Sequence, residues 1–550
     1  MLKKWGVSNF KSIKEADIEL GPLTIFTGTN SSGKSSFIQS ILLIAQTLRN
    51  PNSETLSLKG PLFPFGTFDH FQSSKDKKVD FKFTLLEDRG GGESEHVCKL
   101  SFTNGKNPWL NYFLFSSQGY WGGGILPLGS LLIEGKKDNE SDEYFKNINF
   151  DIKEMHSAAV LKRKKIENIK YVNISHFFPE VFYTYNEDKI KKDIENTLNY
   201  VLEEEHWVDG DEYEDGFFLD DSMKYIDEDY KALFYSDKYS VLDEEGDFFC
   251  FNKENILKDE KEILEKMYII KQEKMYNLKN LEDLGNLKCL EELKNYLSNY
   301  FSYSVKYLGP LRFRRSLHPF SQLKDPKDVG ISGKYTASVI NRFEEEEKHY
   351  PLPDDDSQKE ESIKFNEALN KWLQYLGVAY EVKSNQVGIH GYELKARLSS
   401  KDELRDLTTQ IGTGVSQILP IITMCLLADN DSTVIIEQPE EQLHPKIQSK
   451  LADFFIAMAL NGRQCIIETH SEYLIEQLRF RILEMSNKFQ LHEKTRLYFV
   501  KKRDGISYFE NIEINKYAEF DEWPEDFFDE SHKIAKKFAD EAIRQSESGD

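Results

Sequence analysis

The chain is 550 residues long, with 39% hydrophobic and 13% aromatic residues. This length exceeds one compact core, so we expect two or three structural units, and the composition excludes a disordered chain. The formal net charge of −23 argues against a protein that coats DNA nonspecifically, since phosphate binding needs a positive face. A local basic patch is compatible with this charge.

The cysteines and the apolar runs bear on where the protein works. The five cysteines contain no CxxC pair, which disfavours a structural zinc site or a disulfide framework and favours the reduced cytosol. Residues 1–20 carry charges throughout and lack the apolar core of a signal peptide. The longest apolar run, residues 419–428, contains Pro420 and is too short to span a bilayer. We therefore expect a soluble, cytoplasmic protein.

The strongest signal is the segment GTNSSGKS at residues 28–35. Two short predicted strands, 2–20 and 23–27, precede it and an apolar helix over 35–47 follows, which is the context of a GxxxxGK[ST] phosphate loop. Its glycines let N–H groups point at phosphates, and the helix N-terminus adds its dipole. Lys34 is expected to reach the β- and γ-phosphates and Ser35 to ligate magnesium. The nucleotide-binding candidates are Gly28, Thr29, Asn30, Ser31, Ser32, Gly33, Lys34, Ser35 and Ser36.

The middle of the chain contains two kinds of sequence. Residues 79–115 alternate apolar and polar positions between Gly-rich separators, which predicts antiparallel strands or hairpins. Residues 116–304 are rich in charge and predict a mainly helical insertion. Within it, 253–301 is typical of one or two amphipathic helices with a stripe of Leu278, Leu281, Leu284 and Leu287. Its densely acidic part has three interpretations: a solvated loop, a partner surface or a DNA mimic.

Core signals return after residue 305. Three short β-rich apolar runs, 433–437, 464–469 and 497–500, alternate with helical stretches, the rhythm of a parallel sheet with crossovers. We predict an α/β fold, an ABC-type P-loop ATPase head with a mixed sheet, an antiparallel subsheet and helices on both faces. The predicted units are an N-terminal lobe over 1–115, the insertion over 116–304, a C-terminal lobe over 305–500 and a tail over 501–550 that packs on the head.

Two of these runs lead into residues suited to nucleotide chemistry. Glu437 ends the run TVIIE, and an acid at such a strand end, the Walker B acid, holds magnesium through water. His470 follows the run QCIIET, where a histidine can meet a γ-phosphate. The alternative is an ordinary surface or capping histidine ahead of a helix that starts at Ser471.

A small-residue loop, IGTGVSQ, opens an apolar helix upstream of the strand that ends at Glu437. In an ABC-type ATPase such a signature loop presses its N–H groups and hydroxyl on the γ-phosphate bound to the other protomer. A plain helix N-cap explains Ser416 but leaves the glycines unused. The candidate residues are Gly412, Thr413, Gly414, Ser416 and Gln417.

The order GTNSSGKS, GTGVSQ, IIEQPEEQLHP, IIETHS resembles the ATPase family that includes the ATPase part of overcoming-lysogenization-defect nucleases, RecF-like heads and the ATPase subunits of Septu-type phage defence. The segments SNFKSI, YLGPLR and FDEWPEDFFDE are similar to a bacterial subgroup with a short C-terminal domain of unknown function. The resemblance covers about 1–75 and 305–530.

The resemblance implies ATP and Mg²⁺ as cofactors, and it assigns roles to residues. It puts Lys34 and Ser35 on phosphate and magnesium, and Glu437 on magnesium. It puts Ser416 on the opposing γ-phosphate and His470 in the switch position. Gln72, which lies in the interval of the Gln loop, is a candidate magnesium ligand, with a plain surface glutamine as the alternative.

One position departs from these relatives. They place a carboxylate directly after the Walker B acid to orient or deprotonate the attacking water, and this chain has Gln438 there. An amide cannot accept that proton, so either Glu440 takes over or turnover is slow. We expect slow hydrolysis, with the ATP-bound dimer as the working state.

The resemblance implies an ATP-dependent switch, a homodimer or higher oligomer of heads that acts on a separate effector such as a nuclease in anti-phage defence. The nuclease relatives carry a metal-binding Toprim domain after the switch histidine, whereas Glu510, Glu513 and the later acids show no such arrangement. We expect Trp523, Phe527 and Phe528 to dock a terminal helix instead. The alternatives are a nuclease site within the insertion and a RecF-like adaptor for DNA.

Two basic clusters are candidates for contact with nucleic acid, KRKK at 162–165 and the set of Arg312, Arg314 and Arg315. A charge run is more often a solvated face. Arg312 has a further interpretation, in which it serves the head or the nucleotide.

Overall fold

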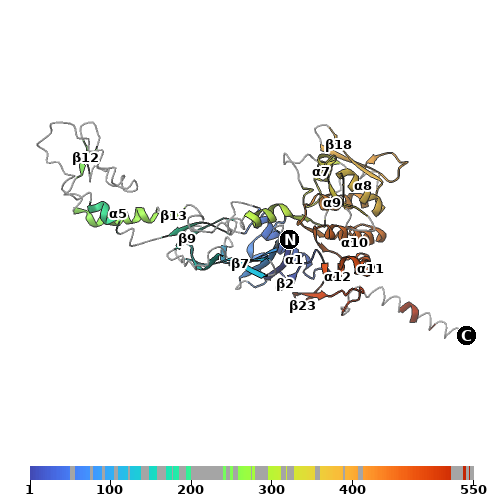
Figure 1. Ribbon diagram of the computed structural model, residues 1–550, viewed down its shortest axis with the longest axis horizontal. Coiled ribbons are helices and arrows are strands. Elements are labelled where there is room, and N and C mark those ends of the chain that lie inside the picture. The colour runs from blue at the N-terminus through green and yellow to red at the C-terminus, as the bar shows by residue number, and fades with distance from the viewer. Residues whose placement is uncertain are drawn as a thin grey trace.

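Figure 1 shows the computed structural model and labels its helices and strands. The structure describes residues 1–49, 56–74, 78–88, 93–103, 109–121, 124–137, 148–157, 169–175, 178–184, 192, 194–199, 240–242, 248–251, 258–273, 276–278, 295–310, 312, 317–318, 328–353, 360–387, 391–406, 413–521, 537–540 and 544. Among the helices within these ranges, none is long and apolar enough to cross a membrane.

A six-stranded sheet forms the centre of the head, and five of its strands run parallel. In sheet order the strands are β14 (Val305–Leu308), β21 (Thr433–Glu437), β22 (Gln464–Glu468), β3 (Leu23–Gly28), β23 (Thr495–Arg503) and the antiparallel β24 (Ile506–Ile512). Every residue of β21 and β22 is buried, as expected for strands that are covered on both faces. The predicted parallel sheet with crossovers is confirmed.

Alternate residues of the central strands belong to two different hydrophobic cores. In β21, Val434 and Ile436 lie in one core and Ile435 in the other. In β3, Ile25 and Phe26 divide in the same way. Each such side chain contributes roughly 1.5–3 kcal/mol when fully buried, so apolar packing fixes the strands from both sides. The carboxyl ends of the strands are thereby held in place, and the candidate site lies there.

The helices that precede or follow the central strands in the chain are α1 (Lys34–Leu48), α9 (Thr413–Leu427), α10 (Pro445–Leu460), α11 (Glu472–Phe489) and α12 (Leu491–Lys494). Capping residues set where two of them begin. His444 Nδ1 accepts a hydrogen bond from Lys446 N at 3.3 Å, and Pro445 occupies the first helical position, where its missing N–H costs nothing. Ser471 Oγ accepts from Leu474 N at 3.2 Å at the start of α11.

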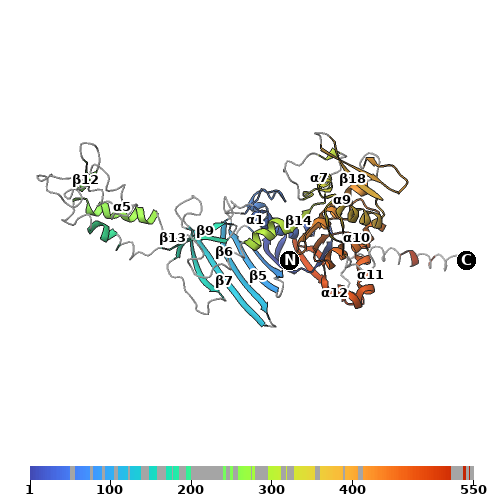
Figure 2. The same cartoon turned by 45° about the horizontal axis from the view of Figure 1, so that its top comes forward.

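The second sheet is antiparallel and ten-stranded, and Figure 2 shows it extending beside the head. In sheet order its strands are β2 (Ile13–Glu19), β1 (Leu2–Phe10), β4 (Val79–Asp88), β5 (Glu93–Thr103), β6 (Trp109–Trp121), β7 (Gly124–Lys137), β8 (Ile148–Ser157), β9 (Ile169–Ser175), β10 (Phe178–Thr184) and β13 (Tyr276–Leu278). Alternate residues of β4, such as Phe81 and Phe83, are buried, and Trp5 stacks on Phe83 with ring centroids 5.2 Å apart. The antiparallel strands predicted over 79–115 are confirmed.

The insertion differs from its predicted mainly helical form. Within the described part of 116–304, strands β7 to β10 and β13 continue the antiparallel sheet, and β11 (Ser240–Leu242) pairs with β12 (Phe248–Phe251). Helix α5 (Glu260–Glu273) is one of the helical segments there. The difference has a physical reason. Stretches such as INFDIKEM alternate apolar and polar residues, and this period of two is typical of a strand even where many of the polar residues are charged.

Several predictions on the insertion concern residues outside the described ranges. These are the acidic stretch, the KRKK cluster and the residues Leu281, Leu284 and Leu287; Leu278 lies in β13. The division at residues 115 and 304 stays a prediction, although β6 runs through residue 115. Downstream, the π-helix η4 (Tyr300–Ser304) leads directly into β14.

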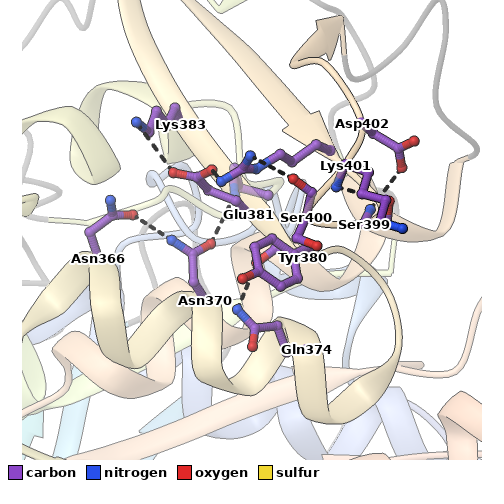
Figure 3. A network of polar contacts seen from close by, with 12 residues as sticks. Asn366, Asn370, Gln374, Tyr380, Glu381, Lys383, Ser399, Ser400, Lys401 and Asp402 are labelled. Atoms are coloured by element: carbon purple, nitrogen blue, oxygen red, sulfur yellow. Dashed lines mark hydrogen bonds and ion pairs between the residues drawn. The ribbon is translucent and has the colours of Figure 1, made fainter.

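A smaller lobe follows β14 and comprises β15 (Leu317–His318), α7 (Thr336–Phe343), β16 (Glu347–Pro351), β17 (Glu360–Lys364), α8 (Phe365–Leu376), β18 (Glu381–Val387), β19 (Gly391–Arg397) and β20 (Arg405–Asp406). Figure 3 shows the polar contacts that join α8 to β18. Gln374 Nε2 donates to Tyr380 O at 2.8 Å, and Asn370 Oδ1 accepts from Val382 N at 2.8 Å. These bonds satisfy backbone groups where β18 begins.

Candidate functional site

The phosphate loop joins β3 to α1, and two of its glycines hold backbone angles that other residues rarely adopt. Gly28 has a φ of 135° and Gly33 a φ of 115°. A Cβ at Gly28 would lie 2.2 Å from Val500 O, and one at Gly33 would lie 2.1 Å from Ser507 Oγ. Both glycines are therefore required by the backbone angle and by the close approach of β23 and β24.

Lys34 is buried at the start of α1, with 2% of its surface exposed. Its Nζ donates to Gly28 O at 3.1 Å and to Thr29 O at 2.8 Å, so the ammonium group is bound to its own loop. Burial lowers the pKa of Lys34, and the nearby carboxylates of Glu468 and Glu440 oppose this shift. A cation in this position can exchange the two carbonyl oxygens for phosphate oxygens.

Glu468, at the end of β22, was not among the sequence candidates. Ser35 Oγ donates to Glu468 Oε1 at 3.0 Å, which links the phosphate loop to the strand that precedes the switch histidine. Burial raises the pKa of Glu468, and the bond from Ser35 and the charge of Lys34 act in the opposite direction. The signal was available in the sequence, because IIET repeats the strand ending of IIEQ.

Glu437, the predicted Walker B acid, lies beside Glu468 in the register of β21 and β22. Tyr307 Oη, from β14, donates to Glu437 Oε1 at 2.9 Å. Burial first, and then the charge of Glu468, raises the pKa of Glu437 to about 7, against the effects of Tyr307, Arg312 and Lys11. Two buried acids side by side gain most from a cation placed between them.

Arg312 holds the turn that follows the Walker B acid. Its buried guanidinium donates to Glu437 O at 2.7 Å and to Gln438 O at 3.1 Å. Burial lowers the pKa of Arg312 to about 10, and the surrounding glutamates oppose the shift, so it stays charged at neutral pH. Gln438 has a φ of 47°, and its N–H donates to Glu468 O at 2.7 Å. This geometry favours the interpretation in which Arg312 stabilises the head over the one in which it contacts nucleic acid. Arg314 and Arg315 lie outside the described residues.

Glu440 is engaged by the loop of the switch histidine. Its Oε2 accepts from Thr469 Oγ1 at 2.8 Å, and its Oε1 accepts from His470 N at 2.6 Å. Burial raises the pKa of Glu440, and these bonds act against the shift. Burial and the charge of Lys34 lower the pKa of His470, which favours the neutral imidazole. Glu440 therefore anchors His470 in this arrangement.

A cavity of about 450 Å³ opens over the phosphate loop. Its lining residues are Lys11, Ser12, Asn30, Ser31, Ser32, Gly33, Lys34, Ser35, Ser36, Gln39, Gln438, Glu468, His470 and Lys502. Lys11 comes from the turn between β1 and β2, has a φ of 51°, and its ammonium is bound to Gln39 Oε1. Lys11 lies in SNFKSI, but a lysine in a hairpin turn carries no sequence signal for a phosphate site. Lys502 lies in β23, and a lysine within a strand carries no sequence signal for a phosphate site either.

The signature residues lie away from this cavity. Gly414, Ser416 and Gln417 belong to the first turns of α9, none of them lines the cavity, and Gln417 is fully buried. Gly412 lies outside the described residues, and the side chain of Thr413 is not described. Gln72 forms an isolated antiparallel bridge with Phe10 and does not line the cavity either.

The Ser35 hydroxyl and the carboxylates of Glu437 and Glu468 suit Mg²⁺, which usually takes one or two carboxylates together with phosphate oxygens and water. The second carboxylate oxygen of Glu468, Oε2, is buried and has no hydrogen-bond partner among the described residues. It belongs to the carboxylate that already meets the Ser35 hydroxyl. In the part of the chain that the structure describes, no group of three or more His, Cys, Asp or Glu side chains could hold a metal.

A phosphate loop in a parallel sheet, flanked by an antiparallel sheet, defines a mixed α/β fold of the predicted class. The sequence model described as "AAA ATPase domain" matches residues 1–475. The chain belongs to this AAA ATPase family. A second model, "Protein of unknown function (DUF3696)", matches residues 491–537, which confirms the predicted C-terminal domain of unknown function.

No curated protein matches the chain. Similar solved structures include the SMC head domain from Thermotoga maritima, with 10% identity, a TM-score of 0.32 and coverage of 93% of this chain and 99% of that chain. Another is a Smc head domain with an extended coiled coil, bound to the C-terminal domain of ScpA and derived from Pyrococcus furiosus, with 13% identity, a TM-score of 0.34 and coverage of 98% and 99%.

Proposed function

We propose that the chain binds ATP with Mg²⁺ in the cavity over the phosphate loop and hydrolyses it slowly. The cluster at the carboxyl ends of β3, β21 and β22 carries this proposal, with Lys34 bound to its own loop and Ser35 bonded to Glu468. Hydroxyl, amide and ammonium groups line the cavity, and its volume falls in the range of ligand pockets. Membership of the AAA ATPase family supports the same substrate.

On binding, Lys34 exchanges the carbonyl oxygens of Gly28 and Thr29 for β- and γ-phosphate oxygens. The residues that would hold Mg²⁺ are Ser35 and Glu437, with Glu468 beside them. Bound Mg²⁺ neutralises charge on the phosphate oxygens. Because the pKa of Glu437 is about 7, this residue gives up its proton when positive charge arrives. His470 faces the same cavity as a neutral hydrogen-bond partner for the terminal phosphate.

The proposed slow turnover rests on Gln438 and Glu440. The Gln438 side chain lines the cavity at the position where a general base is usual, and an amide cannot take the proton of the attacking water. Both oxygens of Glu440 accept hydrogen bonds from the loop of His470, and Glu440 does not line the cavity. Gln438 therefore has no carboxylate to act as the base, and the carboxylate of Glu440 is already held by hydrogen bonds.

We further propose that two heads share each ATP site. The signature residues Ser416 and Gln417 do not line the cavity of their own chain, which fits a role against the nucleotide of a second copy. The resemblance noted from the motifs supports a homodimer or higher oligomer that switches a separate effector, such as a nuclease, in cytoplasmic anti-phage defence. Contact with nucleic acid stays a prediction, and the candidate cluster at 162–165 lies outside the described residues.

The test is single-turnover and steady-state ATP hydrolysis by the purified full chain with Mg²⁺. We expect measurable ATP binding, slow turnover, and a rise in kcat of at least roughly tenfold in Gln438→Glu, since a positioned base contributes on the order of 10²–10⁴. Lys34→Ala should abolish binding, while Lys14→Ala, an exposed lysine outside the cavity, should not. Rapid wild-type turnover that Gln438→Glu leaves unchanged would contradict slow hydrolysis. Magnesium-dependent cleavage of DNA or RNA by the same preparation would favour the nuclease alternative.

A further inference from the structure

The hairpin of β23 and β24, residues 495–512, forms one wall of the phosphate loop. Strand β23 runs parallel to β3, with Val500 opposite Gly28 in the register. The approach is so close that a Cβ on Gly28 would lie 2.2 Å from Val500 O. This hairpin belongs to the segment matched by the model of unknown function. Its position gives the segment a direct physical contact with the loop.

Ser507 ties the hairpin to a second loop. Its N–H donates to Ser12 O at 2.8 Å, and its Oγ donates to Ser12 Oγ at 2.7 Å. Ser12 follows Lys11 in the turn between β1 and β2 and lines the cavity. The Ser507 hydroxyl also fills the space beside Gly33. The hairpin is therefore fixed against both loops that border the cavity.

Two neighbouring lysines on β23 face in different directions. Lys501 pairs with Glu510 at 2.9 Å and stands over the Phe499 ring, so its charge is balanced within the hairpin. Lys502 lies directly opposite Ser507 across the hairpin, which places its side chain on the same face as the hydroxyl next to Gly33. It lines the cavity, and no ion pair or hydrogen bond to its ammonium occurs among the described residues.

We propose that Lys502 is a ligand for the polyphosphate of the bound nucleotide, supplied by the C-terminal hairpin. This inference rests on the proposed function, because it assumes ATP in the cavity. With Lys11 and Lys34, it gives the cavity three cations from three separate segments of the chain. An unbalanced ammonium on a rigid wall attracts an anionic chain without disturbing any existing pair. The segment of unknown function thereby becomes part of the nucleotide site.

The experiment measures ATP and ADP affinity of the full chain by isothermal titration at 50 and 200 mM KCl, for the wild type, Lys502→Gln, Lys502→Arg and Lys501→Gln. Losing an exposed charge that lines the cavity should raise the Kd for ATP roughly three- to tenfold in Lys502→Gln. The Kd should also depend less on salt in this variant, because one screened attraction is gone. Lys502→Arg should restore both properties, and Lys501→Gln should match the wild type.

The outcomes separate the two proposals. If the wild type does not bind ATP, the proposed function itself fails. If the wild type binds ATP and Lys502→Gln matches it in affinity and salt dependence, only the role of Lys502 fails. An equal loss in Lys501→Gln would also overturn this role, since it would point to damage of the hairpin. Thermal unfolding of each variant shows whether the hairpin is intact.

Discussion

Buried charge is concentrated behind the phosphate loop at the scale of single residues. Glu437, Glu440 and Glu468 all have a raised pKa through burial, whereas burial lowers the pKa of Lys34 and Arg312. Charged groups that are kept from water in this way lower the stability of the fold unless they have partners of opposite charge, which a ligand can supply. In the proposed complex the nucleotide and Mg²⁺ would supply these partners, so binding should stabilise the fold by mass action.

The pKa of Glu437 predicts a pH dependence of stability without nucleotide. A carboxyl with a folded-state pKa of about 7, against an unfolded value of 4.5, holds its proton more tightly in the folded state. Its contribution is therefore full below pH 4.5 and is lost as the pH rises towards 7, an effect of up to about 3 kcal/mol. Urea unfolding at pH 5, 6, 7 and 8 should show this fall. Glu437→Gln should reduce the slope, the exposed Glu15→Gln should not, and equal slopes in all three chains would refute the effect.

At the scale of elements, the caps and the two-sided burial of the central strands determine the geometry of the site. Helix α11 begins immediately after the switch loop, and Ser471 is its cap. The Ser471 hydroxyl accepts from Leu474 N and donates to Gln448 Oε1 at 2.7 Å, which also ties α11 to α10. The position of His470 therefore depends on a local cap as well as on Glu440.

Ser471→Ala should lower the free energy of unfolding by about 1–2 kcal/mol, because it removes an N-cap and a buried hydrogen bond. Ser471→Thr keeps the hydroxyl and should lose less. Ser449→Ala, at a half-buried position of α10, serves as the matched control. Chemical denaturation of the three variants measures the difference. A Ser471→Ala chain as stable as the control would show that the cap does not hold this loop.

Local patterns predicted much of the fold and part of the site. The strand, loop and helix around 28–35 follow from apolar runs and glycines within one short segment, as do the central strands. The insertion was predicted to be mainly helical because its high charge obscures the alternation of apolar and polar residues that is typical of strands. Tyr307, Lys11 and Lys502 could not be found in this way, since each reaches the site from a distant segment through sheet register. Glu468 could have been found, because its strand ending repeats that of Glu437.

At the scale of the whole molecule, the chain that follows the antiparallel sheet returns directly to the strands that carry the candidate site. The π-helix η4 passes into β14, which pairs with β21 and places Tyr307 on Glu437. Arg312, four residues after β14 ends, holds the turn at Gln438. The segment that leaves the antiparallel sheet is thus joined to the candidate site by three hydrogen bonds, one from Tyr307 and two from Arg312. Such a connection would let nucleotide binding in the head and contacts made by the insertion influence each other.

In the proposed function, ATP joins two copies of this head. Sedimentation velocity of the full chain, with Mg²⁺ and with or without ATP, tests it directly. We predict a larger species with ATP than without it, and no such shift in Lys34→Ala or in Ser416→Arg, a change that places a bulky cation in the first turns of α9. Because turnover is expected to be slow, the ATP-bound species should persist through the run. A wild-type chain that binds ATP to saturation and sediments unchanged would contradict the shared site.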